Sequence, residues 1–251
     1  MGRVTGYVIE RGMSTLAHRA VEVVAVALLP ATPSKANRKT GPALTISYLP
    51  VAEIPYEAAH VSGLDEAVCG DCKLRPLSPS PAKDGCYLTK VHGISQVWRR
   101  FVAGGYPDAD DAAWERMLSA GFVRFGGWGD PACFPPGHVE KFADIEKQAG
   151  YTHQHRRPFA QHLKRWMMAS CETLAEREEA KDRGWRSYRI RIPGAPLLRG
   201  EIDCPYPRVQ CNRCGACDGA KVGRRKPDVS IEAHGPVHKI RAITKFQEEV
   251  A

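Results

Sequence analysis

The stretch that decides the fold is Phe122-Val-Arg-Phe125, which runs directly into Gly126-Gly127-Trp128-Gly129-Asp130-Pro131. The apolar and β-branched residues predict a short strand, and the glycines after it predict a tight turn. A helical spacing of apolar residues then begins behind two prolines and ends at Gly150. Strand, turn and helix in this order are typical of a parallel α/β unit.

The same alternation recurs on both sides of this unit. About six strands result, and this number suits a partial parallel α/β barrel of about six strands or an open doubly wound sheet. In either architecture a ligand binds at the carboxyl ends of the strands. The predicted strands are 43–49, 122–125, 151–153, 166–170, 185–192 and 229–233; the predicted helices are 94–103, 109–120, 135–149, 158–165 and 171–183.

Proline-rich and cysteine-rich segments suggest how the 251 residues are divided. Residues 1–36 are interpreted as an N-terminal appendage and linker, in which 22–29 adds at most one strand. Residues 37–195 would form the α/β partial barrel. Residues 196–228 would be a cysteine-rich metal-binding insertion, and 229–251 would supply the last strand and the C-terminal segment.

Composition narrows the class of protein. The chain is 43% hydrophobic and 25% charged, which is ordinary for a globular protein, and its net charge of +8 favours an anionic partner such as a nucleotide or nucleic acid. Nine cysteines are too sparse for a disulfide scaffold and indicate a reducing compartment. The apolar run 21–29 is shorter than the about 20 residues that span a bilayer. We therefore expect a cytoplasmic protein without a membrane partner.

Three cysteines lie close together in one proline-rich loop. Cys69 and Cys72 are separated by two residues, so both thiolates can face one ion, and Cys86 supplies a third. A closed zinc site needs four protein ligands, so three thiolates leave one position open for a substrate or cofactor. The alternative is that Cys69 and Cys72 join the later cysteines in a long-range zinc site.

A second cluster holds four cysteines with the spacing C-x6-C-x2-C-x2-C. Four thiolates so close in sequence can complete a tetrahedral site for zinc or hold an iron–sulfur cluster. The plainer interpretation is a structural clip for a polar loop. The other two cysteines, Cys133 and Cys171, are interpreted as buried small residues. The cluster consists of Cys204, Cys211, Cys214 and Cys217.

Polar residues at two strand ends are the candidate binding and catalytic groups. Gly126 and Gly127 would let the backbone approach a ligand closely, and Asp130 offers a carboxylate for a hydroxyl, an amine or proton transfer. The alternative is a tight strand-to-helix turn in which Asp130 caps the helix region that begins at Pro135. His153 is a candidate acid or base, or else a hydrogen-bonded structural residue.

The chain resembles an uncharacterised family of small phage-encoded proteins, which brings no known activity. The resemblance rests on Cys-Gly-x-Cys at 69–72, Cys86-Tyr87, Arg-x-Gly-x-x-Gly-Asp-Pro at 124–131, Gly-Tyr-Thr-His-Gln at 150–154 and the late cysteine cluster.

The predicted layout is also similar to that of radical S-adenosylmethionine enzymes, which have a six-stranded partial barrel. In that family a three-cysteine loop after the first strand holds an iron–sulfur cluster, and a Gly-Gly-acid motif after the second strand binds the methionyl amine. The resemblance assigns Cys69, Cys72 and Cys86 to the cluster, and Gly126, Gly127 and Asp130 to the cofactor. The spacing here is C-x2-C-x13-C rather than C-x3-C-x2-C, and the acid does not directly follow the glycine pair.

Three hypotheses follow. The first is an iron–sulfur, radical-S-adenosylmethionine-like enzyme of phage origin that modifies a nucleotide or nucleic-acid base, with Asp130 and His153 in its pocket. The second is a zinc-stabilised base-exchange enzyme of the transglycosylase type, with Asp130 or Asp203 as nucleophile. The third is a zinc-bearing nucleic-acid-binding protein without catalysis.

Overall fold

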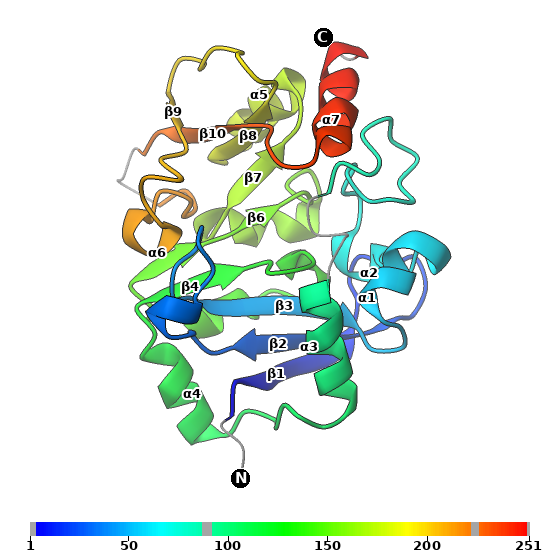
Figure 1. Ribbon diagram of the computed structural model, residues 1–251, viewed down its shortest axis with the longest axis vertical. Helices are drawn as coiled ribbons and strands as arrows, with labels where there is room; N and C mark the ends of the chain where they lie inside the picture. Colours follow the sequence, from blue (N-terminus) through cyan, green and yellow to red (C-terminus); the bar gives the residue numbers. More distant parts are fainter. Residues whose placement is uncertain (1–3, 87–91, 222–225, 250–251) are drawn as a thin grey trace.

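The strands of the molecule form two sheets, which follow each other from the lower to the upper part of Figure 1. The computed structural model describes residues 4–86, 92–221 and 226–249. Tyr87 of the Cys86-Tyr87 pair lies outside these residues.

The first sheet is mixed and has the order β1-β2-β3-β4-β5. β1 (Gly6–Met13) and β2 (Glu22–Leu28) form an antiparallel hairpin, and β2 pairs antiparallel with β3 (Leu44–Pro50). β4 (Phe122–Phe125) and β5 (Lys147–Ala149) continue the sheet in parallel. The change from antiparallel to parallel pairing thus occurs at β3.

The second sheet is parallel throughout and has the order β6-β7-β8-β10-β9. Its strands are β6 (Tyr151–Thr152), β7 (Met168–Cys171), β8 (Ser187–Arg191), β9 (Glu201–Asp203) and β10 (Asp228–Glu232).

Gly150 joins the two sheets, because it alone separates β5 from β6. The Met168 backbone N–H donates to the Gly150 carbonyl at 3.1 Å. A Cβ atom at position 150 would lie only 3.1 Å from the Cβ of Phe125, so the missing side chain lets the strands approach. The α/β class predicted from the sequence is confirmed, with one mixed and one parallel sheet. The strand pairings of the described residues leave β1 and β5 at the edges of the first sheet and β6 and β9 at the edges of the second, so they do not close a barrel.

The helices connect and flank the strands. They are α1 (Pro55–Glu57), α2 (Glu66–Cys69), α3 (His92–Val102), α4 (Asp111–Leu118), α5 (Leu174–Asp182), α6 (Cys211–Cys214) and α7 (Val237–Glu249). α5 packs against β7 and β8.

Two of the predicted helices are 3-10 segments instead. Only 139–142 of the stretch 135–149 is helical, and 158–165 is 3-10 throughout. Pro135 and Pro136 lack the N–H that an α-helix needs beyond its first turn, and the chain re-enters a strand at Lys147, so little length is left for a helix. The N-cap of α4 is Asp110, whose side chain accepts the Ala113 N–H at 2.8 Å.

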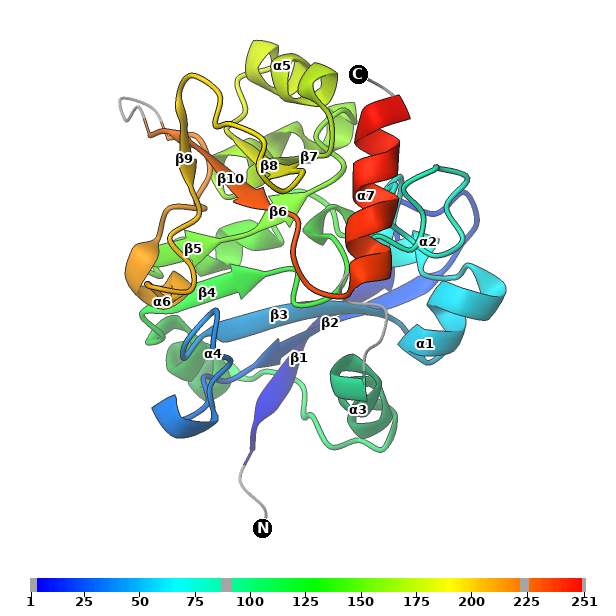
Figure 2. The same cartoon turned by 45° about the horizontal axis from the view of Figure 1, so that its top comes forward.

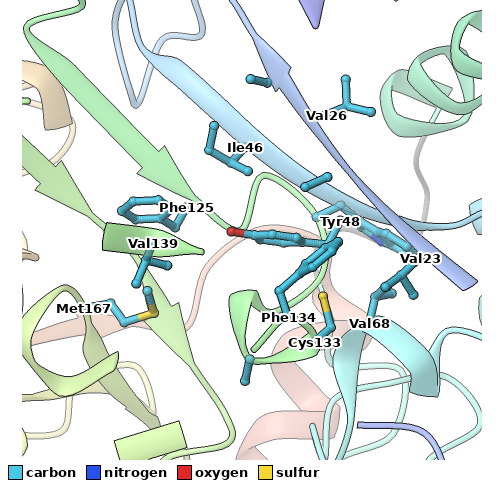
Figure 3. Packing of buried hydrophobic residues seen from close by; sticks show 14 of the residues in the cluster. Val23, Val26, Ile46, Tyr48, Val68, Phe125, Cys133, Phe134, Val139 and Met167 are labelled. Atoms are coloured by element: carbon cyan, nitrogen blue, oxygen red, sulfur yellow. The ribbon is translucent and has the colours of Figure 1, made fainter. Parts of the chain in front are cut away.

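The N-terminal strands belong to the main core and are not an appendage. All five residues from Val23 to Ala27 are fully buried, and β2 lies between β1 and β3 in the sheet. Figure 3 shows Val23 and Val26 in the same packed cluster as Tyr48. The division expected at residue 36 therefore does not separate two bodies, because the pairing partner of β2 lies beyond that boundary.

A second, smaller core lies beneath the C-terminal helix. Ile243 and Phe246 of α7 are buried in it together with Leu74 and Ala82 from the loop after α2. Figures 1 and 2 both show α7 standing beside this loop. α7 therefore holds the segment that carries the first three cysteines.

Candidate functional site

A cavity of about 490 Å³ lies along the parallel strands and the turns that follow them. Its volume falls within the range of about 300–1,000 Å³ that is usual for small-molecule sites. The strand residues in its wall are Thr45 of β3, Arg124 of β4, Tyr151 of β6, Ser170 of β7, Tyr188 and Ile190 of β8, and Ile231 of β10. We call this the central cavity.

Several residues singled out in the sequence meet in the wall of this cavity. Cys72 and Cys86 line it from the proline-rich loop. Gly126 and Gly127 line it after β4, and His153 lines it after β6. Gly126, Gly127 and His153 therefore lie where the sequence predicted them, just after the carboxyl ends of their strands. Cys69 and Asp130, in contrast, are not part of the wall.

The loop that carries Cys69 and Cys72 is fixed from two sides. Cys69 is the last residue of α2, and the Cys72 N–H donates to its carbonyl at 3.1 Å. Gly70 between them has a φ of 51° and leaves room for Gln154, whose Nε2 also donates to the Cys69 carbonyl at 3.0 Å. Arg75 donates to the Gly70 carbonyl at 2.8 Å. The turn that separates the two thiols is thus held by distant parts of the chain.

Cys86 is brought back to this turn by two backbone contacts. The Cys86 N–H donates to the Leu74 carbonyl at 3.0 Å, and the Lys239 side chain of α7 donates to the Cys86 carbonyl. Burial raises the pKa of the Cys69 thiol, and the nearby charges of Asp65, Cys72 and Cys86 raise it further. These backbone contacts bring Cys86 back to the turn that carries Cys69 and Cys72.

His153 links the cysteine loop to the second sheet. Burial lowers the pKa of His153, but the charges of Cys72 and Glu172 and hydrogen bonds to both outweigh it, so the pKa lies well above its usual range. The His153 Nδ1 is 3.2 Å from a carboxylate oxygen of Glu172, which is only 3% exposed. The imidazole thus sits between a thiol and a carboxylate at the cavity wall and can hold or pass a proton there.

Asp130 is a structural brace rather than a pocket acid. It is 4% exposed, and its carboxylate accepts the Thr152 hydroxyl at 2.9 Å and the backbone N–H groups of His153 and Ala132 at 2.9 and 3.0 Å. Burial raises the pKa of Asp130, and these hydrogen bonds oppose the rise. The carboxylate caps the 3-10 segment Pro131–Cys133, and not the region at Pro135 for which the sequence suggested a cap. It positions His153 but does not reach the cavity.

The glycine pair also has a packing reason. Gly126 has a φ of 71°. A Cβ at Gly127 would fall 2.5 Å from the Thr45 side chain and 2.7 Å from the Ser47 hydroxyl, and the Gly127 N–H already donates to the Ile46 carbonyl at 2.8 Å. The turn is therefore pressed against β3 while it faces the cavity.

The four later cysteines line a separate small cavity of about 20 Å³, next to Lys39 and Tyr151. Burial raises the pKa of Cys217 to about 11, opposed by a hydrogen bond from Tyr151. Burial also raises the pKa of Cys211, whereas the charges of Arg124 and Lys39 lower it. α6 is attached to the segment that precedes β3, because the Cys211 N–H donates to the Lys39 carbonyl at 2.9 Å.

Both sets of cysteines contact the smaller core: Cys72 and Cys217 are buried in it, and Cys69, Cys86, Cys204 and Cys211 pack against it. Cys69 interacts with Cys72 and Cys86, and Cys217 interacts with Cys204 and Cys211. In residues 4–86, 92–221 and 226–249, no group of three or more His, Cys, Asp or Glu side chains is arranged to hold a metal ion. Cys133 and Cys171 are both fully buried, as interpreted from the sequence.

The carboxylates required by the base-exchange hypothesis do not face the central cavity. Asp203 pairs with Arg191 at 2.9 Å, and its side chain is 55% exposed. The hydrogen bond from Arg191 lowers the pKa of Asp203. Asp130 is buried in the brace described above, so neither group is placed to attack a substrate in this cavity.

Sequence reasoning missed the cationic and aromatic part of the wall. Arg124 was quoted as part of a motif without a role, although a charged residue inside an apolar strand is a signal for a buried polar function. Lys39 carries no local signal of a role, because no phosphate-loop pattern precedes it. Tyr151 and Tyr188, whose rings stack with centroids 4.1 Å apart, carried no local signal.

Comparison of the chain with known proteins found no relative. No protein-family model, no curated protein and no solved structure matches it. Among the described helices, none is both long and apolar enough to cross a bilayer.

Proposed function

We propose that this protein is an iron–sulfur enzyme that modifies a nucleotide or nucleic-acid base, and that its parallel strands act as a partial α/β barrel. The observation that carries the proposal is the meeting of Cys72, Cys86 and the Gly126-Gly127 turn in one cavity, with Cys69 beside them. Ligands of α/β sheets bind at this end of the strands.

Three thiols from one loop are a donor set that an iron–sulfur cluster can use. Thiolates around one zinc ion lie about 3.8 Å apart, because each Zn–S bond is about 2.3 Å in a tetrahedron. Among the described residues, no group of three or more His, Cys, Asp or Glu side chains has the arrangement that a single ion needs. A cluster of several irons holds its thiolates further apart, and three thiolates leave one iron open. When bound, such a cluster supplies one-electron chemistry at the open iron.

The residues of this chain would hold and shield the reacting groups. Gly126 and Gly127 offer backbone to a ligand in the central cavity. His153, held between Cys72 and Glu172, would keep or move a proton at the cavity wall. α7 excludes water from the loop side, because Ile243 and Phe246 pack on that loop.

The second set of cysteines would hold its own metal. Cys204, Cys211, Cys214 and Cys217 all line one small cavity, so zinc or a second cluster there would clip α6 and β9 onto the strands. Four thiols are enough to complete such a site without outside ligands, which suits a structural or auxiliary role.

The test is the metal and sulfide content of protein expressed and purified without oxygen. We expect iron together with acid-labile sulfide in the wild type. The triple variant Cys69→Ala, Cys72→Ala, Cys86→Ala should lose that part of the iron, and the control Cys133→Ala should keep it because Cys133 lies in the apolar core. A colourless wild-type protein with stoichiometric zinc and no iron would overturn the proposal.

A further inference from the structure

Two basic side chains line the central cavity. They are Lys39 and Arg124, whereas His153 of the same wall is already paired with Glu172. Among the described residues of its wall there is no aspartate or glutamate. Cationic groups in a partly closed, low-dielectric site attract anions strongly, because little water screens them. The wall therefore favours an anionic ligand.

Arg124 is the most telling of these residues. Its Nη1 atom is buried and has no hydrogen-bond partner, and none of the ion pairs among the described residues includes Arg124. Its guanidinium lies over the Tyr151 ring, 5.1 Å from the centroid. A buried donor without a partner costs about 1–3 kcal/mol. The Arg124 guanidinium is charged, it is held in place by stacking, and it keeps one donor without a partner. An oxyanion site requires these three properties.

Lys39 supplies a second cation beside it. It lines both the central cavity and the small cysteine cavity, and its Nζ lies 5.4 Å from the centroid of the Tyr206 ring. No carboxylate pairs with it in the part of the chain that the structure describes. An arginine fork and an ammonium group on one side of a cavity are suited to a phosphate, which carries more charge than a carboxylate.

The rest of the wall is suited to a flat apolar body. Tyr151 and Tyr188 stack next to Arg124, and Ile190, Ile231 and Leu74 complete an apolar surface. Aromatic and apolar side chains of this kind hold nucleobases by stacking, with little dependence on which base is present. A cavity of about 490 Å³ has room for one such ligand.

From these observations we infer that the central cavity binds a nucleoside monophosphate, with its phosphate on Arg124 and Lys39 and its base against the Tyr188 side of the wall. This names the substrate class of the enzyme proposed above and rests on that proposal for its catalytic meaning. The binding site itself depends only on the cavity and its charges.

Calorimetric titration of the purified protein tests this inference. The probes are the four common nucleoside 5′-monophosphates, the matching nucleosides, inorganic phosphate and a short single-stranded oligonucleotide. We expect at least one monophosphate to bind, and its nucleoside to bind more weakly. Arg124→Gln should weaken binding by about 30-fold or more, because it removes one partner of a buried charge pair. Lys39→Gln should weaken it in the same direction.

Arg116→Gln is the matched control, since Arg116 is an exposed arginine of α4 and lies outside the central cavity. It should leave binding unchanged. The inference is overturned when no monophosphate binds, when nucleosides bind as tightly as their monophosphates, or when both variants bind like the wild type. It is also overturned as a mononucleotide site when only the oligonucleotide binds.

Iron analysis of the same samples separates this inference from the proposed function. Arg124-dependent binding by a protein without iron would support the phosphate site and remove the iron–sulfur proposal. An iron-containing protein that binds none of the monophosphates would overturn this inference and leave the iron–sulfur proposal in place.

Discussion

Asp130 shows how one carboxylate can position a site without taking part in it. It accepts three hydrogen bonds, from the turn after β4 and from β6, and its own N–H donates to the Val68 carbonyl of α2 at 2.6 Å. The cysteine loop, the glycine turn and His153 are thereby set relative to one another. A change at Asp130 therefore has to act first on structure.

We expect Asp130→Asn to lower the free energy of unfolding by about 1–3 kcal/mol, because the amide presents a donor to buried N–H or O–H donors that need an acceptor. Urea denaturation measures the change. Asp108→Asn is the control: its side chain is 72% exposed in a surface ion pair with Arg11, so its loss should cost about 1 kcal/mol or less. Unchanged stability together with abolished activity would return Asp130 to a catalytic role.

At the scale of elements, the site depends on a helix that is distant in sequence. α7 places Ile243 and Phe246 against Leu74 and Ala82, and Lys239 of the same helix donates to the Cys86 carbonyl. The cysteine loop has little regular structure between α2 and residue 86, so these contacts largely define its path. Weakening α7 should loosen the thiols before it affects the strands.

Ile243→Ala should cost about 2–5 kcal/mol of stability, because Ile243 is fully buried and the truncation leaves a cavity. Limited proteolysis should show faster cleavage within 70–86, and thermal unfolding should show the loss of stability. The control Lys245→Ala removes a side chain that is 74% exposed and should change stability by about 0.5 kcal/mol or less. Equal protection of the loop in both variants would contradict the role assigned to α7.

Elements set by local sequence could be predicted, and those set by distant partners could not. The strand at 122–125 and the helix ending at Val102 follow from apolar periodicity over a few residues. β1 was missed because its partner, β2, and the partner of β2, β3, lie outside any local window. The positions of Cys72, Cys86 and Gly126 in the cavity follow from the strand order. The role of Arg124 does not, since it depends on a ring and a cavity built by other segments.

At the scale of the whole molecule there are two cores, and the apolar wall of the central cavity belongs to the smaller one. The larger core contains the hairpin β1–β2, and the smaller one contains α7 and the second sheet. Cys69 packs against both. The cysteine loop therefore depends on the N-terminal hairpin as well as on the C-terminal helix, and the hairpin should unfold together with the rest.

The contact that tests this is the one between Glu10 of β1 and His138. The Glu10 carboxylate lies 2.7 Å from the His138 Nδ1 and 2.6 Å from the Lys141 Nζ. Burial raises the pKa of Glu10, but the hydrogen bonds and charges of His138 and Lys141 outweigh this effect. Together they lower the pKa from 4.5 to about 2. The carboxylate is thus favoured by folding. Its contribution to stability is present above pH 4.5 and is lost as the pH falls toward about 2.

His138 acts in the same direction at higher pH. Burial lowers its pKa below 6.5, although Glu10 opposes this, so the folded state favours the neutral ring. The stability that His138 contributes is present above pH 6.5 and falls as the ring becomes protonated in the unfolded chain. The contributions of Glu10 and His138 are therefore both lost on acidification, His138 first.

Glu10→Gln should lower the free energy of unfolding at neutral pH by about 1.5–3 kcal/mol, the usual worth of hydrogen bonds to a charged group. The difference from the wild type should shrink as the pH falls from 4.5 toward 2, because the wild-type carboxylate also becomes neutral. Urea denaturation across this range gives the curve, with Glu146→Gln, whose side chain is 79% exposed, as the flat control. If β1 and β2 formed an appendage, Glu10→Gln would melt them in a separate early step and leave the main transition in place. A single shifted transition is the outcome expected of a hairpin built into the core.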